Sequence, residues 1–462
     1  MSNKPLNPKG TRDFNPLTLQ RRRYIIDIIS STFESFGYNE IETPSIERRS
    51  TLYHKYGTEG DKFLFNIINS GEKISKADLK AFNNKNYSDF ISSISEKGLR
   101  FDLTVPLARY VSQHQNEISF PFKRFQIQNV WRADRPQKGR YQEFTQCDAD
   151  VIGSDSILLE FEMIQLYSSV FRKLKLNDVV IKINHRQVLN AIAKKIGVKD
   201  NFNDFVISLD KIDKVGAEKT KEELKSKFNN NSEIDKLFDI INKNPNHQEY
   251  LKLIKNYLSE SDLKLLSDLE TIINMIDEDK KLINIDFDIS LARGLEYYTG
   301  MIYEVSLKSD SSIGSLGGGG RYENLTESFN LKNNSGIGVS FGLDRIFHVI
   351  NDKELFPQKI SLNNEILVIN FGVEYIYKIL DLLNEIRGLG KKVFIYPDTI
   401  KLSKQFSYAN NNSFKEVLIY GESEDNDNLV KIRNMESGLE KDFDLKDFIN
   451  KSLRSKSFSK PD

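Results

Sequence analysis

Two runs of alternating apolar and polar residues, joined by a short basic stretch, constrain the fold of this chain more than any other feature. They occupy residues 122–131 and 144–152. A period of two places successive side chains on opposite faces, so each run predicts a strand with one buried face. Two such strands with a short connection predict a long antiparallel hairpin. We therefore expect an antiparallel sheet in this part of the chain.

The composition excludes several classes of protein. With 462 residues, of which 39% are hydrophobic and 29% charged, the chain predicts a globular protein of about three domains. No apolar run reaches the ~18 residues that a membrane span needs, and the N-terminal residues predict no secretory signal. The single cysteine, Cys147, excludes an intramolecular disulfide and a Cys-based zinc cluster, which fits a reducing, cytoplasmic setting.

Changes in periodicity and composition predict the division of the chain. Lys, Asp, Glu and Asn become frequent after residue 185, with Leu and Ile at helical spacing, and alternating strands and helices after residue 365 predict a small α/β domain with parallel pairing. The expected parts are a core of residues 1–184 and 284–350 with a polar surface insertion at about 66–98, a helical insertion at 185–283, a linker at 351–364, an α/β domain at 365–450 and a disordered tail at 451–462.

The basic stretch between the two predicted strands is the candidate for anion binding. The chain carries 66 Lys and Arg against 66 Asp and Glu, so contacts to phosphates must come from a local patch. Arg132 adjoins the end of the first strand, where its planar guanidinium can present two donors to a phosphate. Phe144, which begins the returning strand, offers a face for a purine. The alternative is a solvated hairpin tip with no ligand.

Two further patterns point to a small-molecule site, each with a structural alternative. Gln146, Asp148 and Asp150 alternate along the second strand and share one face; they either bind a polar ligand or simply face water. The glycines at 317–320 allow close approach of a ligand to the backbone, or form a flexible linker. Residues 336–345 are a glycine-rich stretch that ends in Arg345, and they also fit a plain strand-to-helix turn with a surface arginine.

These segments together resemble the class II aminoacyl-tRNA synthetases, and specifically the histidyl-tRNA synthetase family. The resemblance extends through nearly the whole chain. Residues 8–14 are similar to the opening signature of the family, and residues 37–44, 131–144 and 336–345 to class motifs 1, 2 and 3. Residues 291–300 (LARGLEYYTG) and 318–323 (GGGRYE) resemble the two motifs that distinguish the histidine enzyme.

The resemblance implies a fold, an activity and a set of partners. The fold is an α+β catalytic domain with an antiparallel sheet in residues 1–184 and 284–350, a helical insertion, and a C-terminal α/β anticodon-binding domain. The activity is ATP-dependent activation of L-histidine to histidyl-adenylate, followed by transfer of histidine to the 3′ end of its tRNA, with Mg²⁺ accompanying ATP. A cytoplasmic homodimer is implied, with Pro44 at the interface and no membrane association.

The resemblance also implies roles for individual residues, which are predictions at this point. Arg132 and Arg293 are the catalytic cations. The predicted ligands fall into three groups: Asp102, Thr104, Gln146, Asp150, Arg293, Tyr297, Tyr298 and Tyr322 for histidine; Arg132, Asp134, Arg140, Phe144 and Arg345 for ATP; and Arg135 and Gln137 for tRNA. No cluster of protein ligands for a metal is predicted.

The sequence departs from the family pattern at two places, and three alternative functions have to be considered. Asp134 stands where motif 2 usually has glutamate, which predicts a shifted ATP contact, and the insertion at 66–98 is longer than usual. The main alternative is a catalytically inactive, synthetase-like regulator of histidine biosynthesis. The retained Arg132, Arg293 and Arg345 argue against it. A synthetase for another amino acid is disfavoured by residues 291–300, and a plain RNA-binding module leaves the pocket residues unexplained.

Overall fold

The structure is a computed structural model in which the chain divides into two units. One comprises Met1–Phe14 and Arg21–Phe356, and the other Asn15–Gln20 and Pro357–Asp462. The described residues are 5–53, 63–136, 139–198, 202–228, 230–243, 246–292, 298–310, 313–322, 327–329, 334–358, 360 and 364–445. The predicted site residues Gln137, Arg293 and Tyr297 and the predicted disordered tail lie outside them.

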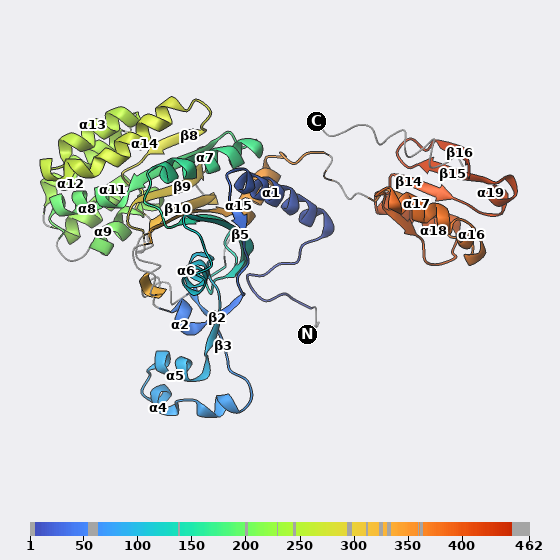
Figure 1. Cartoon of the computed structure of the whole chain (residues 1–462), viewed down its shortest axis with the longest axis horizontal. Helices are drawn as coiled ribbons and strands as arrows, with labels where there is room; N and C mark the ends of the chain where they lie inside the picture. The colour runs from blue at the N-terminus through green and yellow to red at the C-terminus, as the bar shows by residue number, and fades with distance from the viewer. Residues whose placement is uncertain are drawn as a thin grey trace. The chain divides into compact units, whose positions relative to one another are not determined.

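The predicted hairpin lies inside the large sheet of the first unit (Figure 1). Residue Phe122 pairs with Ile152 and Trp131 with Glu143 in a continuous antiparallel ladder, which confirms the antiparallel sheet. Among the described strands the order is β1-β5-β6-β11-β10-β9-β7-β8. Their bounds are β1 Asn39–Glu40, β5 Phe122–Trp131, β6 Glu143–Ile152, β7 Val179–His185, β8 Asn284–Phe287, β9 Met301–Leu307, β10 Gly317–Tyr322 and β11 Gly336–Gly342. The two pairs at the ends of this order, β1 with β5 and β7 with β8, are parallel.

Helices α1 (Pro16–Ser35), α6 (Thr104–Gln113), α7 (Leu158–Lys173) and α15 (Leu343–Asp352) belong with this sheet. Pro16 fits the first turn of α1 because its missing N–H has no partner to lose there, and the Asn15 side chain accepts the N–H of Thr18 at 2.8 Å. The buried face of α1 brings Phe33 against Phe125 of β5 and Phe341 of β11, with ring centroids 5.5 and 5.7 Å apart. These contacts fix α1 on the sheet and, with it, the segment that precedes it.

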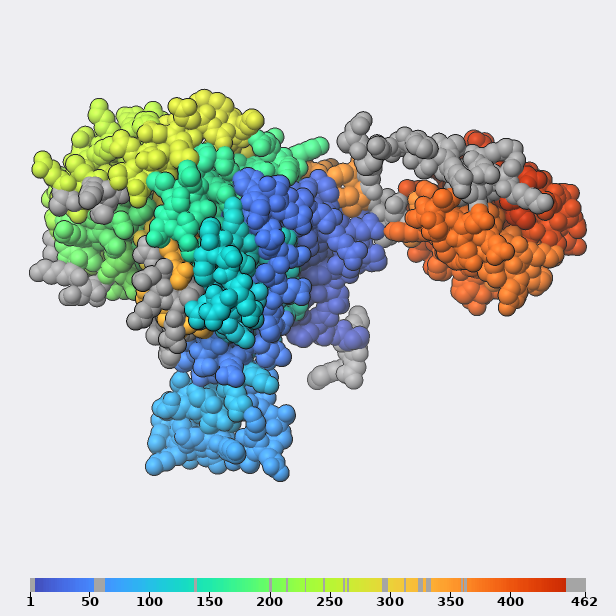
Figure 2. Space-filling view, in the orientation of Figure 1, coloured from blue at the N-terminus to red at the C-terminus, as the bar shows by residue number. Residues whose placement is uncertain are grey.

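The insertion predicted at 66–98 forms an arm that projects from the first unit (Figures 1 and 2). Its base is a small antiparallel sheet in the order β2-β4-β3, and its tip consists of short helices. The bounds are β2 Ile46–Arg48, α2 Arg49–Leu52, β3 Phe65–Ile67, η2 Gly71–Lys76, α4 Leu79–Asn83, α5 Tyr87–Ile94 and β4 Lys97–Leu99. The arm contributes few buried residues, which agrees with its polar sequence.

The segment predicted to be a helical insertion consists of helices in the part that is described. They are α8 Arg186–Ile196, α9 Phe202–Leu209, α10 Ile212–Val215, α11 Ala217–Lys227, α12 Asn231–Lys243, α13 His247–Tyr257, η3 Glu260–Leu266 and α14 Ser267–Glu278. Their apolar faces belong to the same hydrophobic cluster as the sheet residues Ile181, Phe287 and Tyr303. The helices therefore share the core of the first unit. None of the helices described in the chain combines the length and apolarity needed to cross a bilayer.

The second unit contains a five-stranded sheet, within the described residues, in the order β13-β12-β14-β15-β16. The predicted parallel pairing holds for β12 with both β13 and β14, but β15 and β16 add an antiparallel hairpin that the sequence analysis did not predict. Strand β16 is mostly charged, and the alternation in β15 rests on Val430 and Ile432 alone, so together they give a weak strand signal. The bounds are β12 Ile366–Val368, α16 Val373–Lys378, α17 Leu380–Gly388, β13 Val393–Ile395, α18 Leu402–Asn411, β14 Glu416–Ile419, α19 Glu422–Asp427, β15 Leu429–Asn434 and β16 Glu440–Asp444.

Candidate active site

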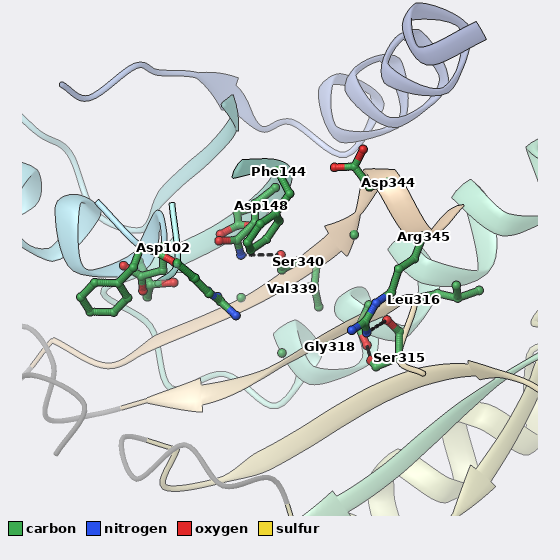
Figure 3. Close-up of a pocket in the computed structure, with 18 of the residues that line it drawn as sticks. Asp102, Phe144, Asp148, Ser315, Leu316, Gly318, Val339, Ser340, Asp344 and Arg345 are labelled. Atoms are coloured by element: carbon green, nitrogen blue, oxygen red, sulfur yellow. Dashed lines mark hydrogen bonds between the residues drawn. The ribbon is translucent and has the colours of Figure 1, made fainter. Parts of the chain in front are cut away.

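A cavity of about 330 Å³ lies over the face of the large sheet, between the motif 2 hairpin and the start of α15 (Figure 3). Most of the residues predicted for histidine and ATP line it: Asp102, Thr104, Arg132, Asp134, Arg140, Phe144, Gln146, Asp150, Tyr298, Tyr322 and Arg345. Arg135, predicted to contact tRNA, is exposed and does not line the cavity in the described part of the chain. One pocket thus gathers residues that are distant in sequence.

The face shared by Gln146, Asp148 and Asp150 forms one wall of this cavity. Antiparallel pairing with β11 sets Asp148 opposite Ser340 and Asp150 opposite Gly338. Asp148 and Asp150 are each only 3% exposed, so the alternative in which these carboxylates simply face water is wrong. Gln146 donates to the Ser340 hydroxyl at 3.0 Å.

The glycine cluster at 317–320 is part of the interior strand β10 and is not a flexible linker. Its backbone is paired on both sides, with β9 and with β11. A Cβ at Gly319 would lie 2.1 Å from the Gly338 carbonyl oxygen, and one at Gly320 would lie 2.6 Å from the Tyr298 ring. The strand needs glycine because neighbouring groups occupy the space of a side chain. Gly317, Gly318 and Gly319 also line the cavity.

Three arginines converge on the end of the cavity predicted to hold ATP. The Nε of Arg132 donates to the Phe101 carbonyl at 2.9 Å, and its guanidinium lies 5.1 Å from the centre of the Phe144 ring. Arg345 donates to the carbonyls of Gly139 and Ser315 at 3.3 and 2.6 Å. Burial lowers the pKa of Arg345, and the positive charges of Arg140 and Arg132 lower it further. Because three positive charges line the same end of the cavity, this end is suited to bind an anion.

Asp134 illustrates the departure from the usual motif 2. Its carboxylate pairs with Arg140, with N···O distances of 2.7 Å to Nη2 and 2.9 Å to Nε. The shorter side chain therefore orients an arginine of the hairpin tip. Among the described residues, no group of three or more His, Cys, Asp or Glu side chains is placed to hold a metal ion.

The opposite end of the cavity is acidic. Burial raises the pKa of Asp102 to about 7, and the charge of Arg132 works against that rise. Burial also raises the pKa of Asp148 to about 7, with the neighbouring charge of Asp150 adding to the effect. In the described part of the chain, one carboxylate oxygen of each and the Oε1 of Gln146 have no hydrogen-bond donor. Buried acceptors of this kind require a donor or a cation.

Asp150 differs because two protein groups face its carboxylate, although its Oδ2 also has no hydrogen bond among the described residues. Arg124, fully buried on β5, lies 2.8 Å from its Oδ2, and the Tyr322 hydroxyl donates to its Oδ1 at 2.7 Å. Burial raises the pKa of Asp150, while these two partners lower it. Sequence reasoning assigned no role to Arg124, Ser340 or Tyr141 and none to Asp148 beyond its face. Arg124 could have been found from the predicted hairpin, because its register places Arg124 directly opposite Asp150.

Two charged motif residues form buried ion pairs with other elements: Arg321, which is not among the described lining residues of the cavity, and Asp344, which is. Arg321, within the 318–323 motif, forms a buried ion pair with Glu160 and donates to the Ser335 hydroxyl at 2.6 Å. Asp344 is buried and accepts from Arg12 at 2.7 Å and from Arg22. Arg321 thus ties β10 to α7, and Asp344 ties the start of α15 to the N-terminal segment and α1.

The raised pKa of Asp148 predicts a stability change that depends on pH. Between its unfolded value of 3.8 and about 7, the folded protein binds more protons than the unfolded one, so stability falls as pH rises through this interval. We expect Asp148→Asn to raise the Tm of the ligand-free protein at pH 8 by at least about 2 °C, and to change it little at pH 4. Thermal unfolding across this range tests it. Asp27→Asn, at an exposed carboxyl of α1, is the control, and a pH-independent difference contradicts the prediction.

Comparison with known proteins places the chain in a family. Residues 89–346 match the family model described as histidyl-tRNA synthetase, and residues 365–455 match the anticodon binding domain. The chain is 48% identical over 448 residues to the histidine–tRNA ligase of Christiangramia forsetii, covering 96% of this chain and 98% of that relative. The chain belongs to the histidyl-tRNA synthetase family.

Other members of the histidyl-tRNA synthetase family agree along the full length. The histidine–tRNA ligase of Phocaeicola vulgatus is 47% identical, with 95% of this chain and 96% of that relative covered. The crystal structure of histidyl-tRNA synthetase from Nostoc sp. PCC 7120 superposes with a TM-score of 0.78 at 27% identity, covering 97% of this chain and 99% of that one. The class II fold, with its antiparallel catalytic sheet and C-terminal α/β domain, is thereby confirmed.

Proposed function

We propose that this chain activates L-histidine with ATP to form histidyl-adenylate and then transfers histidine to the 3′ end of its tRNA. The observation that carries the proposal is the cavity itself. Three arginines meet at one end, and buried carboxylates with unsatisfied oxygens lie at the other, on a sheet of the histidyl-tRNA synthetase fold. One end suits a polyphosphate, and the other suits a small cationic amino acid.

The activation step brings together the ligands of the two ends of the cavity. The histidine carboxylate attacks the α-phosphorus of ATP, the bond from that phosphorus to the bridging oxygen breaks, and pyrophosphate leaves. Negative charge accumulates on the phosphoryl oxygens in the transition state, where fixed donors stabilise it by about 3–4 kcal/mol each. We assign this role to Arg132 and, by resemblance, to Arg293; Arg345 and Arg140 hold the departing phosphates. In the second step a ribose hydroxyl of the tRNA attacks the activated carboxyl, and AMP leaves.

The acidic end accounts for the choice of amino acid. We assign the α-ammonium group to Asp102, Thr104 and Gln146, and propose that Asp148 adds a carboxylate beside them. Asp150, held by Arg124 and Tyr322, is assigned to an imidazole N–H, with Tyr298 near the ring. A site that hydrogen-bonds its substrate rejects analogues without those groups by about 10⁴–10⁵.

The remaining partners follow from the family. We propose that the second unit, which matches the anticodon binding domain, contacts tRNA, and that Arg135 and Gln137 contact its acceptor end.

Asp134 and Asp344 are paired with arginines. We therefore propose that Mg²⁺ would bind together with ATP, through the phosphates, and would neutralise their charge. A cytoplasmic homodimer and the domain boundaries at 185–283 and 351–364 are also proposed. An inactive regulator is not favoured, because the phosphate-binding arginines and the C-terminal domain are retained.

ATP–pyrophosphate exchange tests the proposal directly. Purified protein with ATP and magnesium should exchange labelled pyrophosphate when histidine is supplied, and should not do so with the other amino acids. Exchange stimulated by a different amino acid would reassign the pocket, and no exchange with any amino acid would favour the inactive regulator. Charging of histidine tRNA by the same preparation tests the transfer step.

A further inference from the structure

The N-terminal segment, residues 8–14, lies against the returning limb of the motif 2 hairpin, and the reaction proposed above assigns it no role. The carbonyl of Gly10 accepts the backbone N–H of Gln142 at 2.9 Å. Gly10 has a φ of +84°, and a Cβ there would lie 2.7 Å from the Cγ of Gln142. This close approach therefore requires glycine. A turn closed by Thr11, whose hydroxyl donates to the Pro8 carbonyl at 2.8 Å, directs the chain onward to Arg12.

Arg12 connects the two elements that carry the phosphate-binding arginines. Its Nη2 donates to Asp344 at 2.7 Å, and Asp344 directly precedes Arg345 on α15. Its guanidinium carbon lies 3.2 Å from the centre of the Tyr141 ring, and Tyr141 directly follows Arg140. Tyr141 and Asp344 line the cavity, whereas Arg12 is not among its described lining residues. Arg12 therefore contacts two residues of the cavity wall, Tyr141 and Asp344, from the side that faces away from the cavity.

Both partners of Arg12 are fixed by further contacts. The Tyr141 hydroxyl shares a hydrogen bond of 2.8 Å with His348, one turn beyond Arg345 on α15. Asp344 also accepts from Arg22 of α1 and from the backbone N–H of Thr145 at 3.3 Å. Tyr141 and His348, Arg12, the Thr145 N–H and the bond from Arg345 to the Gly139 carbonyl thus all join the hairpin to α15. Arg12 is the one of these links that comes from the N-terminal segment.

The arginines inside the cavity need such support. Arg132, Arg140 and Arg345 carry like charges at one end of the cavity; burial lowers the pKa of Arg345, and the charges of Arg140 and Arg132 add to that effect. In the absence of a ligand this repulsion favours movement of the hairpin tip away from α15. The salt bridge and the ring contact of Arg12 oppose that movement, and they do so at a side chain that is 23% exposed, outside the reacting centre.

We propose that Arg12 is a positioning residue for ATP, which sets the distance between the hairpin arginine Arg140 and the helix arginine Arg345. The inference rests on the proposed function, because it presumes that these arginines bind the ATP phosphates. Arg12 contacts neither substrate. Its loss should therefore affect the ATP end of the cavity and leave the histidine end, where Asp102, Gln146 and Asp150 lie, almost unchanged.

The test is steady-state ATP–pyrophosphate exchange with Arg12→Ala. We expect the KM for ATP to rise about tenfold, because misplacement of a binding group by a fraction of an ångström is costly, while the KM for histidine stays within about twofold. Arg12→Lys keeps the charge opposite Asp344 but loses the planar contact with Tyr141. We expect it to raise the KM for ATP by about threefold.

Arg21→Ala is the matched control. Arg21 also reaches α15, where it donates to Asn351 at 2.7 Å, but it touches neither Asp344 nor Tyr141 in the described contacts. Its KM for ATP should equal that of the wild type. If Arg12→Ala changes both KM values equally, or neither, the positioning role is wrong. If Arg12→Ala does not fold, Arg12→Lys decides: an unchanged KM for ATP overturns the proposal. Lack of exchange by the wild type itself refutes the proposed function instead.

Discussion

Replacing Arg132 with alanine is expected to lower kcat/KM for histidine-dependent pyrophosphate exchange by about 100-fold or more. Arg132 is anchored to the Phe101 carbonyl at 2.9 Å, so its charge is fixed before the reaction and requires no reorganisation. Its charge also lowers the pKa of Asp102, which burial raises to about 7. Without Arg132 that pKa rises further, and Asp102 is less ionised at neutral pH.

Because Arg132 has both roles, the exchange activity of the Arg132→Ala variant should depend on pH. Part of the activity lost by Arg132→Ala at pH 7 should return at pH 8.5, where Asp102 ionises again, and the wild type should change less over the same interval. Exchange rates measured at both pH values test it. Arg23→Ala, at an exposed arginine of α1, serves as the control. A loss below about tenfold would show that Arg132 is not a principal transition-state contact.

Replacing Gly338 with alanine is expected to raise the KM for histidine by at least about tenfold, because overpacking of a filled site forces the neighbouring groups to move. A Cβ at this position would lie 2.0 Å from Oδ1 of Asp150 and 3.0 Å from the Ala149 carbonyl oxygen. Asp150 cannot retreat easily, since Arg124 and Tyr322 hold it from behind. The KM for ATP should change much less, because the arginines lie at the other end of the cavity.

Gly342→Ala provides the comparison for this variant. It lies on the same strand, but a Cβ there would meet its nearest atom, the Leu316 carbonyl oxygen, at 3.4 Å. Its KM for histidine should stay close to that of the wild type. Thermal unfolding of both variants separates local displacement from loss of the fold. A normal KM for histidine in a folded Gly338→Ala protein contradicts the role given to Asp150.

The buried carboxylates of the pocket lower the stability of the ligand-free protein, and binding of the ligand offsets this cost. Asp102 and Asp148 each have an oxygen without a donor in the described part of the chain, and burial raises the pKa of both. The ligand-free protein is therefore destabilised where these groups ionise, and binding of a cationic amino acid relieves that cost. At this end of the cavity, the same carboxylates lower the stability of the free protein and increase its selectivity for the amino acid.

The sequence by itself determined the features that depend on local pattern. Alternation identified β5 and β6, helical spacing identified the helices after residue 185, and the motif residues identified most of the cavity lining. The hairpin of β15 and β16 was missed because β16 is mostly charged and the alternation of β15 is carried only by Val430 and Ile432. The glycines of β10 were ambiguous for a related reason: a residue without a side chain gives no periodic signal.

Only the tertiary structure decided which charges meet. Arg12 and Asp344 are 332 positions apart, and no local pattern relates them; the packing of α1 on the sheet brings them together. Arg124 meets Asp150 because of the register between β5 and β6, which a shift of one residue would reverse. Local periodicity records which side chains are buried, whereas the register of strands and the docking of helices determine which partner each buried charge finds.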